Sequence, residues 1–255
     1  MSTHTLTNDR ALVTAAGQGL GEEIAKTLAR AGAHMLLADI NTAEAERVAR
    51  EINANGGSAV AFQADVTRAL EVAALMRFAE ERWGGIDILV NAAGGFHRFA
   101  PITEIPEDEW DRVITLNLKS AFLCAQAVAK GMMERKKGRI INIASQGATG
   151  PNPYAPSYIP YGTAKAGLVG FTKHLAKHLG QYLITVNAVS PGTTLTPRVR
   201  KVRDAASIEK IKAHSAMNSI VEPQDCAEAV LFLASNESRY ITGININVNA
   251  GTLIV

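Results

Sequence analysis

Short apolar segments alternate with longer helical patterns along almost the whole chain, and this alternation constrains the fold most strongly. The apolar segments predict strands at residues 11–14, 34–38, 59–63, 86–90, 139–144, 184–189 and 244–248. Helical patterns between them cover residues 20–31, 42–54, 69–83, 107–133, 161–179 and 223–234. Strands that are apolar almost throughout, such as IDILV at 86–90, suit a sheet covered on both faces. Repeated strand–helix units join parallel strands through right-handed crossovers, so the sequence predicts an α/β fold, a doubly wound parallel sheet of about seven strands.

Length and composition are those of an ordinary globular domain. Of the 255 residues, 47% are hydrophobic, which excludes a disordered chain. Lys and Arg number 26 and Asp and Glu 24, and the resulting charge of +2 is too small to indicate a nucleic-acid partner. No Pro/Ser-rich linker or internal repeat divides the sequence. We therefore expect one domain over residues 1–255, with a small separate lobe at about 191–221, where the strand–helix pattern is interrupted.

Neither the cysteines nor the N-terminal residues indicate an exported or membrane protein. Cys124 and Cys226 lie in apolar helical patterns and are expected to be buried thiols. Residues 1–10 are polar and lack the apolar stretch of a signal peptide. No run of about 18 apolar residues occurs, so we expect a cytoplasmic protein with no membrane partner.

The first predicted strand leads directly into the glycine-rich turn TAAGQGLG at residues 14–21, and a helix follows. Glycines in such a turn let the backbone approach a pyrophosphate, and the helix N-terminus supplies N–H donors. A glycine motif alone is weak support, because a tight turn requires glycine too. Its strand–turn–helix context indicates a dinucleotide site of the Rossmann type. The predicted contacts are Gly17, Gly19, Leu20 and Gly21.

An acidic residue ends the second predicted strand. Asp39 lies 39 − 19 = 20 residues after Gly19, where a carboxylate can accept both ribose hydroxyls and repel a 2′-phosphate. The other interpretation is an ordinary Asp at a helix entry. The expected cofactor is NAD rather than NADP, and Ile40, the next residue, is a further expected cofactor contact.

Two further strand ends are predicted to contact the cofactor. Asp65 and Val66 follow the third strand and would border the adenine ring. The fourth strand is followed by NAAG, whose small residues would let a flat ligand lie on the backbone, although Asn and Gly also simply make turns. Its residues are Asn91, Ala92, Ala93 and Gly94.

A tyrosine and a lysine near the start of the fifth helix form the candidate catalytic pair. Tyr161 and Lys165 in YGTAK share a helix face, with Cβ atoms about 5–6 Å apart. An ammonium near a phenol lowers the phenol pKa from about 10, so the tyrosine could exchange a proton near neutral pH. An isolated pair of this kind is more often part of an amphipathic helix. Ser145 changes that balance, because it follows the fifth strand at the ligand-binding edge. Asn117, a poor helix former, lies within a predicted helix and would bend it, bind a water or simply be an exposed polar residue.

Together these motifs resemble the short-chain dehydrogenases/reductases over essentially the whole chain. TAAGQGLG is similar to the cofactor turn of that family, NAAG to its fourth-strand motif, and Asn117, Ser145, Tyr161 and Lys165 to its catalytic tetrad. SPGTTLT at 190–196 resembles the segment that holds the nicotinamide carboxamide, which implies contacts from Pro191, Gly192, Thr194 and Thr196. The resemblance implies hydride transfer at a carbon bearing oxygen. Tyr161 would be the general acid/base, Ser145 would orient the substrate, and Lys165 would hold the ribose.

The leading hypothesis is an NAD-dependent oxidoreductase that interconverts a secondary alcohol and its ketone, the alcohol being a small alcohol, polyol, sugar or cyclic diol. The first alternative is a 3-oxoacyl thioester (acyl-carrier-protein) reductase, which would prefer NADPH. The second is an NAD(H)-binding scaffold without turnover. The resemblance also implies a homotetramer.

Several positions depart from the family pattern. Ala15 replaces the first glycine of the turn, and its methyl group would clash if a positive φ is needed, unless Gly17 relieves it. Asn249-Ala250-Gly251 replaces an Asp-Gly-Gly-like ending. Ser145 and Tyr161 are 161 − 145 = 16 residues apart, a few more than usual, and the proline-rich insert should border the substrate pocket. The predicted substrate contacts are Ser145, Gln146, Tyr154, Tyr158 and Arg198.

Two other groups of residues are more simply explained without chemistry. His174 and His178 share a helix face, but no H-E-x-x-H pattern accompanies them, so we expect no metal. The basic cluster of residues 198–203 would either meet an anionic substrate or remain a solvated charge run, which is the better interpretation.

Overall fold

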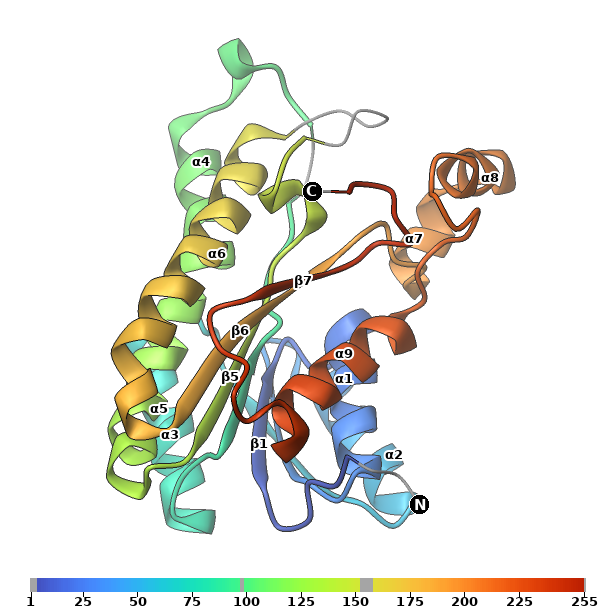
Figure 1. Ribbon diagram of the computed structural model, residues 1–255. Coiled ribbons are helices and arrows are strands. Elements are labelled where there is room, and N and C mark those ends of the chain that lie inside the picture. Colours follow the sequence, from blue (N-terminus) through green and yellow to red (C-terminus); the bar gives the residue numbers. More distant parts are fainter. Residues whose placement is uncertain (1–3, 97–98, 152–157, 255) are drawn as a thin grey trace.

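The computed structural model describes residues 4–96, 99–151 and 158–254. Its centre is a seven-stranded sheet in the order β3-β2-β1-β4-β5-β6-β7 (Figure 1). Every pair of neighbouring strands is parallel. The strands are β1 (Arg10–Thr14), β2 (His34–Asp39), β3 (Ser58–Gln63), β4 (Ile88–Asn91), β5 (Gly138–Ile143), β6 (Ile184–Pro191) and β7 (Asn245–Val248). The predicted doubly wound parallel sheet is confirmed.

Helices cover both faces of the sheet. One face packs against α1 (Gly19–Arg30), α2 (Thr42–Ala54) and α9 (Pro223–Ala234) (Figure 1). The other packs against α3 (Ala69–Trp83), α5 (Ser120–Arg135) and α6 (Ile159–Leu179). Successive strand residues serve the two layers alternately: Val13 of β1 packs on the first side and Leu12 on the second, both fully buried. Each such side chain contributes about 1.5–3 kcal/mol of burial free energy.

The helix predicted at 107–133 is three consecutive elements. They are α4 (Glu107–Ile114), a π-helical turn η2 (Thr115–Lys119) and α5. The turn is centred on Asn117, whose side-chain Nδ2 donates to the Val113 carbonyl oxygen at 2.8 Å, four residues earlier. Of the alternatives expected at Asn117, the exposed polar residue is wrong, because Asn117 is buried; the structure shows a change in helix type there.

The segment between β6 and α9 departs from the strand–helix repeat. It contains α7 (Pro197–Val202) and α8 (Ala205–Ala213), which lie outside the two helical layers in Figure 1. Neither helix contains a buried residue. Short 3₁₀ turns elsewhere are η1 (Ile102–Glu104), η3 (Gln146–Ala148), η4 (Gly180–Tyr182) and η5 (Asn236–Ser238). None of the helices in the described part of the chain is both long enough and apolar enough to span a membrane.

Candidate active site

The predicted motifs meet at the carboxyl edge of the sheet because all seven strands are parallel. Thr14 ends β1 and Asn91 ends the neighbouring β4. The hydroxyl of Thr14 accepts hydrogen bonds from the N–H groups of Ala92 at 3.0 Å and Ala93 at 3.1 Å. These bonds join the glycine-rich turn to the NAAG segment. Asn91 donates to Asn142 Oδ1 of β5 at 2.8 Å, which continues the connection toward Ser145.

Two glycines of the first turn are required by close contacts. A Cβ on Gly21 would lie 2.1 Å from the carbonyl oxygen of Ala15, so no other residue fits there. Gly19 has φ +61°, a left-handed conformation that favours glycine. The side chain of Gln18 makes no capping bond, so the first N–H groups of α1, from Gly19 through Gly21, remain available to an anion.

Ala15 occupies the left-handed conformation itself, with φ +52°. This is the strain that the sequence indicated for an alanine at this position. Gly17 does not relieve it, because Gly17 is not among the glycines with positive φ. Instead, Gly17 is needed for space: a Cβ there would lie 2.9 Å from Glu44 Cβ.

Asp39 is held in place by backbone donors. Its Oδ2 accepts from the N–H of Gly17 at 2.8 Å, and its Oδ1 accepts from the N–H of Asn41 at 2.9 Å. A carboxylate has about four acceptor positions, so each oxygen keeps one for a further donor. The end of β2 therefore presents a fixed negative charge beside the glycine-rich turn.

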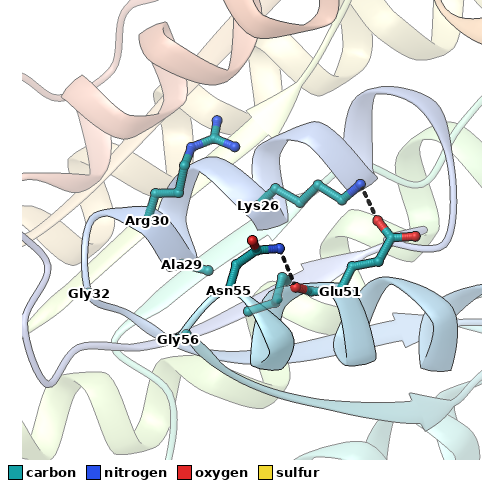
Figure 2. Close-up of a pocket in the computed structure, with 9 residues that line it drawn as sticks. Lys26, Ala29, Arg30, Gly32, Glu51, Asn55 and Gly56 are labelled. Carbon is teal, nitrogen blue, oxygen red and sulfur yellow. Dashed lines mark hydrogen bonds and ion pairs between the residues drawn. The ribbon is translucent and has the colours of Figure 1, made fainter.

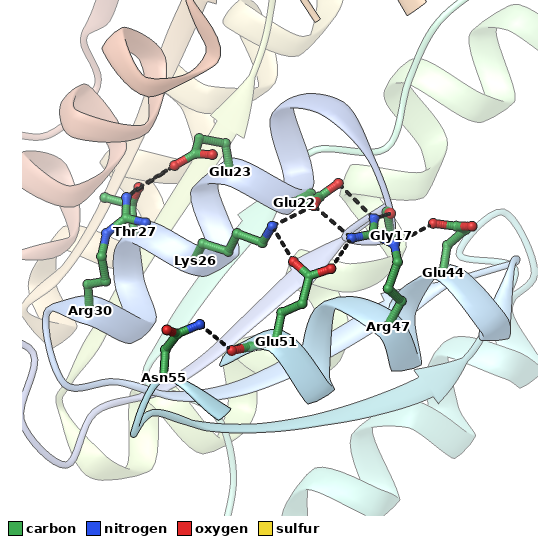
Figure 3. A network of polar contacts seen from close by, with 10 residues as sticks. All are labelled: Gly17, Glu22, Glu23, Lys26, Thr27, Arg30, Glu44, Arg47, Glu51 and Asn55. Carbon is green, nitrogen blue, oxygen red and sulfur yellow. Dashed lines mark hydrogen bonds and ion pairs between the residues drawn. The ribbon is translucent and has the colours of Figure 1, made fainter. Parts of the chain in front are cut away.

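Arg47 of α2 also touches this turn, and the sequence analysis did not identify it. Its guanidinium donates to the Gly17 carbonyl at 3.1 Å and pairs with Glu22 at 3.0 Å, Glu44 at 2.8 Å and Glu51 at 2.7 Å (Figure 3). Three carboxylates thus occupy one guanidinium and raise the pKa of Arg47 further. The only sequence signal for this contact was that Arg47 is a basic residue in the second helix, one turn after Glu44.

Lys165 is buried between the fourth and fifth strand ends. Its Nζ donates to the Ile143 carbonyl at 2.7 Å and lies 5.7 Å from the centre of the Tyr161 ring. A Cβ on Gly94 would lie 2.9 Å from Nζ and 2.7 Å from Asn117 Oδ1, so the glycine of NAAG leaves room for both polar groups. Burial lowers the pKa of Lys165 to about 7.

Tyr161 is partly buried beside Ser145. Burial raises the pKa of the Tyr161 hydroxyl, and a hydrogen bond with Ser145 acts in the opposite direction. The sequence predicted that Lys165 would lower the pKa of Tyr161. In the structure this pKa is raised instead, because the burial of the phenol is the largest effect. Ser145 Oγ also accepts from the N–H of Gly147 at 3.2 Å, which fixes its position at the start of η3.

Asn117 holds the loop that follows NAAG. Its Oδ1 accepts from the Gly95 N–H at 2.8 Å and its Nδ2 donates to the Gly95 carbonyl at 2.9 Å. With the bond to Val113, all the hydrogen bonds that the structure gives this buried amide go to backbone groups. The structure thus adds a positioning task that the sequence did not indicate.

A cluster of aromatic rings adjoins Tyr161 through Phe96. Phe96 lies 5.0 Å from the Tyr161 ring, 5.1 Å from Tyr158 and 5.0 Å from Phe99, centre to centre. The Tyr158 hydroxyl donates to Glu109 at 2.8 Å, so Tyr158 offers mainly its ring to this wall. The sequence analysis did not predict that Phe96 and Phe99 lie at the site. The signal that could have found them is the position of Phe96 directly after NAAGG.

The other predicted contacts are placed as follows. Arg198 is exposed, and its guanidinium lies 3.5 Å from the Phe96 carbonyl oxygen. Gln146 is buried in η3. Tyr154 lies outside the described residues. Asp65 accepts hydrogen bonds from the Thr67 N–H at 2.9 Å and from the Thr67 hydroxyl at 2.6 Å, just before α3. Val66 is buried and Ile40 is exposed.

Residues 190–196, which resemble the segment that holds the nicotinamide carboxamide, lie next to the glycine-rich turn. Thr196 accepts from the Val199 N–H at 3.3 Å, capping α7, and its Cγ2 lies 3.7 Å from where a Cβ of Gly19 would be. Thr194 donates to the Gly192 carbonyl at 3.2 Å. Pro191 is the last residue of β6.

A cavity of about 580 Å³ lies elsewhere, between the C-terminal turns of α1 and α2 (Figure 2). The Lys26–Glu51 ion pair, 2.6 Å long, forms part of its wall. None of the predicted site residues lines it. We assign it to imperfect packing of two helix ends rather than to the candidate site, because the convergent polar groups lie at the sheet edge.

The sequence is similar to known proteins along almost its whole length. A family model described as enoyl-(acyl carrier protein) reductase matches residues 14–252. The chain is 39% identical over 252 residues to a 3-oxoacyl-[acyl-carrier-protein] reductase of Synechocystis sp., with 98% of each chain covered. It is 35% identical over 253 residues to the 2,3-dihydro-2,3-dihydroxybenzoate dehydrogenase of Bacillus subtilis, covering 96% of this chain and 95% of that one.

The structural comparison points the same way. A crystal structure of 7α-hydroxysteroid dehydrogenase complexed with NADH and 7-oxo glycochenodeoxycholic acid superposes with a TM-score of 0.91 at 35% identity, covering 97% of this chain and 95% of that one. The chain belongs to the short-chain dehydrogenase/reductase family. As a member of this family it is an oxidoreductase that acts on CH–OH groups and uses a nicotinamide cofactor.

Proposed function

We propose that this short-chain dehydrogenase/reductase is an NAD-dependent dehydrogenase that interconverts a secondary alcohol and its ketone, with Tyr161 as general acid/base. The observation that carries the proposal is the convergence of Tyr161, Ser145 and Lys165 at the sheet edge that also holds the glycine-rich turn. A scaffold without turnover would not require these groups together.

The residues present fit a nicotinamide dinucleotide. The uncapped N-terminus of α1 would bind its pyrophosphate, and Asp39 would accept from the adenosine ribose. Lys165 has three donors, and among the described residues one acceptor, the Ile143 carbonyl, lies at hydrogen-bond distance, which leaves two donors for the hydroxyls of the second ribose. The exposed Ile40 and the buried Val66 would flank the adenine.

The side chains then divide the chemistry among them. The nicotinamide, when bound, accepts or supplies the hydride. Ser145 Oγ holds the substrate oxygen beside Tyr161, whose hydroxyl or phenolate exchanges the proton. The hydrogen bond with Ser145 acts against the effect of burial on the Tyr161 pKa, and Lys165 Nζ lies beside the phenol, 5.7 Å from the centre of its ring. Asn117 keeps the Gly95 loop fixed beside Lys165.

The charges around the ribose position support NAD over NADP. Asp39 presents a carboxylate there, and a 2′-phosphate would be placed against it. Arg47 is the basic side chain that touches this turn, but Glu22, Glu44 and Glu51 already occupy it. Binding of a 2′-phosphate would require those ion pairs to break.

A second candidate is reduction of a 3-oxoacyl thioester. It is favoured by the 39% identity to the Synechocystis reductase over almost the full length of both chains. The two candidates differ in cofactor as well as in substrate, so one set of assays separates them.

The test is turnover of secondary alcohols, polyols and acetoacetyl thioester with each of the four nicotinamide cofactors, followed by absorbance of the reduced form. We expect alcohol oxidation with NAD and a fall of at least about 100-fold in kcat for Tyr161→Phe, with NADH binding retained. Faster thioester reduction with NADPH would favour the second candidate. Near-normal turnover by Tyr161→Phe would contradict the proposed mechanism.

We also propose that the enzyme is a homotetramer. Phe122, Trp110 and Ile159 leave apolar surface exposed along α4, α5 and the start of α6. Sedimentation of a single species at the monomer mass would contradict this assembly.

A further inference from the structure

Gln146 is a buried polar side chain whose amide oxygen has no partner. The residue is only 7% exposed, and no donor in the described part of the chain reaches its Oε1. Leaving a buried amide oxygen without a hydrogen bond is costly, and native proteins rarely do so without a reason. An unpaired amide at a substrate-binding edge indicates that a ligand completes it.

The position of Gln146 shows which ligand can reach it. It directly follows Ser145 and opens η3. At one end of this short turn, a Cβ on Gly162, next to Tyr161, would lie 3.8 Å from the Gly147 carbonyl. At the other end, a Cβ on Gly192 would lie 3.3 Å from Gln146 Oε1. The Gln146 amide oxygen therefore lies against the segment that resembles the nicotinamide site, and Gly147, the next residue, adjoins the helix that carries Tyr161.

The place of Gln146 in the chain limits the substrate group that could pair with this amide. Gln146 directly follows Ser145, so a substrate whose reacting oxygen lies at Ser145 has its neighbouring carbon atoms nearest to Gln146. The reacting oxygen belongs to Ser145 and Tyr161. Next to Tyr161, the rings of Phe96, Phe99 and Tyr158 offer an apolar wall for the substrate's carbon skeleton.

We propose that Gln146 Oε1 accepts a hydrogen bond from a second hydroxyl of the substrate, next to the carbon that reacts. The preferred substrates are then vicinal diols and α-hydroxyketones rather than simple mono-alcohols. This inference rests on the proposed dehydrogenase function and narrows its substrate class.

The test compares cyclohexane-1,2-diol with cyclohexanol, using NAD and three proteins. Gln146→Met keeps the length of the side chain and removes the amide. Gln181→Met is the matched control, because Gln181 is exposed after α6 and bonds only locally, to the His178 carbonyl at 3.2 Å. The measured quantity is kcat/KM for the diol divided by kcat/KM for the mono-alcohol.

We expect Gln146→Met to lower this ratio by about 10- to 100-fold, the usual effect of deleting one substrate hydrogen bond in a desolvated site. Gln181→Met should leave the ratio unchanged. The NADH dissociation constant of Gln146→Met should stay within about twofold of wild type, and its Tm should not fall, because the substitution removes an unpaired buried atom.

Three outcomes would overturn the inference alone, while wild-type turnover upholds the proposed function. The first is an unchanged ratio in Gln146→Met. The second is a weakening of NADH binding equal to the loss in the ratio, which would assign the amide to the cofactor. The third is a lower Tm of Gln146→Met, which would show that the amide has a structural role. Absence of turnover of both alcohols, and of cyclohexanone with NADH, would overturn the proposed function and this inference with it.

Discussion

Lys165 shows how one buried group connects stability with chemistry. Burial lowers its pKa to about 7, whereas an unfolded lysine titrates near 10.4. Between these values the unfolded chain binds more protons than the folded one, so the contribution of Lys165 to stability rises with pH. Below pH 7 both states are protonated, and the folded protein then carries a buried ammonium.

We predict that the cofactor-free protein gains stability between pH 7 and pH 9.5 through this residue. Lys165→Met should remove that part of the pH dependence and raise the Tm at pH 7, because it replaces a buried charge by an apolar chain of similar length. Thermal unfolding of both proteins across this range is the measurement. Parallel Tm–pH curves for the two proteins would show that Lys165 does not titrate there.

At the residue scale, spacing and position on strand ends located most of the candidate site. Gly17, Asp39, Ser145, Tyr161 and Lys165 all lie at the carboxyl edge where the sequence predicted them. Contacts between distant segments were not predictable. Phe96 becomes a neighbour of Tyr161 only when β4 and α6 are brought together, and the Tyr161 pKa depends on its final burial.

At the element scale, the π-helical turn η2 is the feature that local sequence did not specify. Helix propensity disfavours Asn117 but does not distinguish a bend, a break and a π turn. The choice depends on the Gly95 loop, which meets the Asn117 amide from another part of the chain. The positions of the strands were easier to predict than this turn, because an apolar run flanked by turns specifies a buried strand almost regardless of its neighbours.

We predict that Asn117→Ala destabilises the fold by roughly 2–4 kcal/mol, since it leaves three backbone groups of Gly95 and Val113 without their partner. NADH affinity should fall as well, because the Gly95 loop adjoins Gly94. Urea unfolding and NADH titration are the measurements. Asn55→Ala is the control: Asn55 is exposed and donates to the Glu51 carbonyl, so its loss should cost less than about 0.5 kcal/mol. Equal effects of the two substitutions would contradict this account.

At the scale of the whole molecule, the two ends of the sheet have different tasks. The carboxyl edge carries the candidate site, while the opposite edge is joined by ion pairs around Asp87. That carboxylate pairs with Arg10 of β1 at 2.7 Å and lies 3.7 Å from Lys137, just before β5. Burial opposes its ionisation, but the hydrogen bond from Arg10 and the nearby Lys137 outweigh burial and lower the pKa of Asp87.

A lowered carboxyl pKa stabilises the protein at pH values above the unfolded value of about 3.9, and that stabilisation is lost as the pH falls through the folded pKa. We predict that Asp87→Asn costs about 2–4 kcal/mol at pH 7, and that the difference from wild type shrinks below pH 4. Activity of the folded fraction at pH 7 should persist, since Asp87 lies at the far edge. Glu209→Gln, which removes the exposed Lys212 pair, is the control and should change stability little. A difference that stays constant down to pH 2 would contradict the prediction.

The alanine in the glycine-rich turn has a consequence for how this sequence can change. Ala15 and Ala250 both have φ +52°, and both stand where the family resemblance described above implies glycine. Each alanine carries about 1–2 kcal/mol of left-handed strain. A glycine would remove this strain, and its greater freedom in the unfolded chain would cancel only part of the gain. Alanine and glycine codons differ by one base. The gene therefore has two single-step routes to greater stability, and that reserve could compensate for otherwise destabilising substitutions in the substrate pocket.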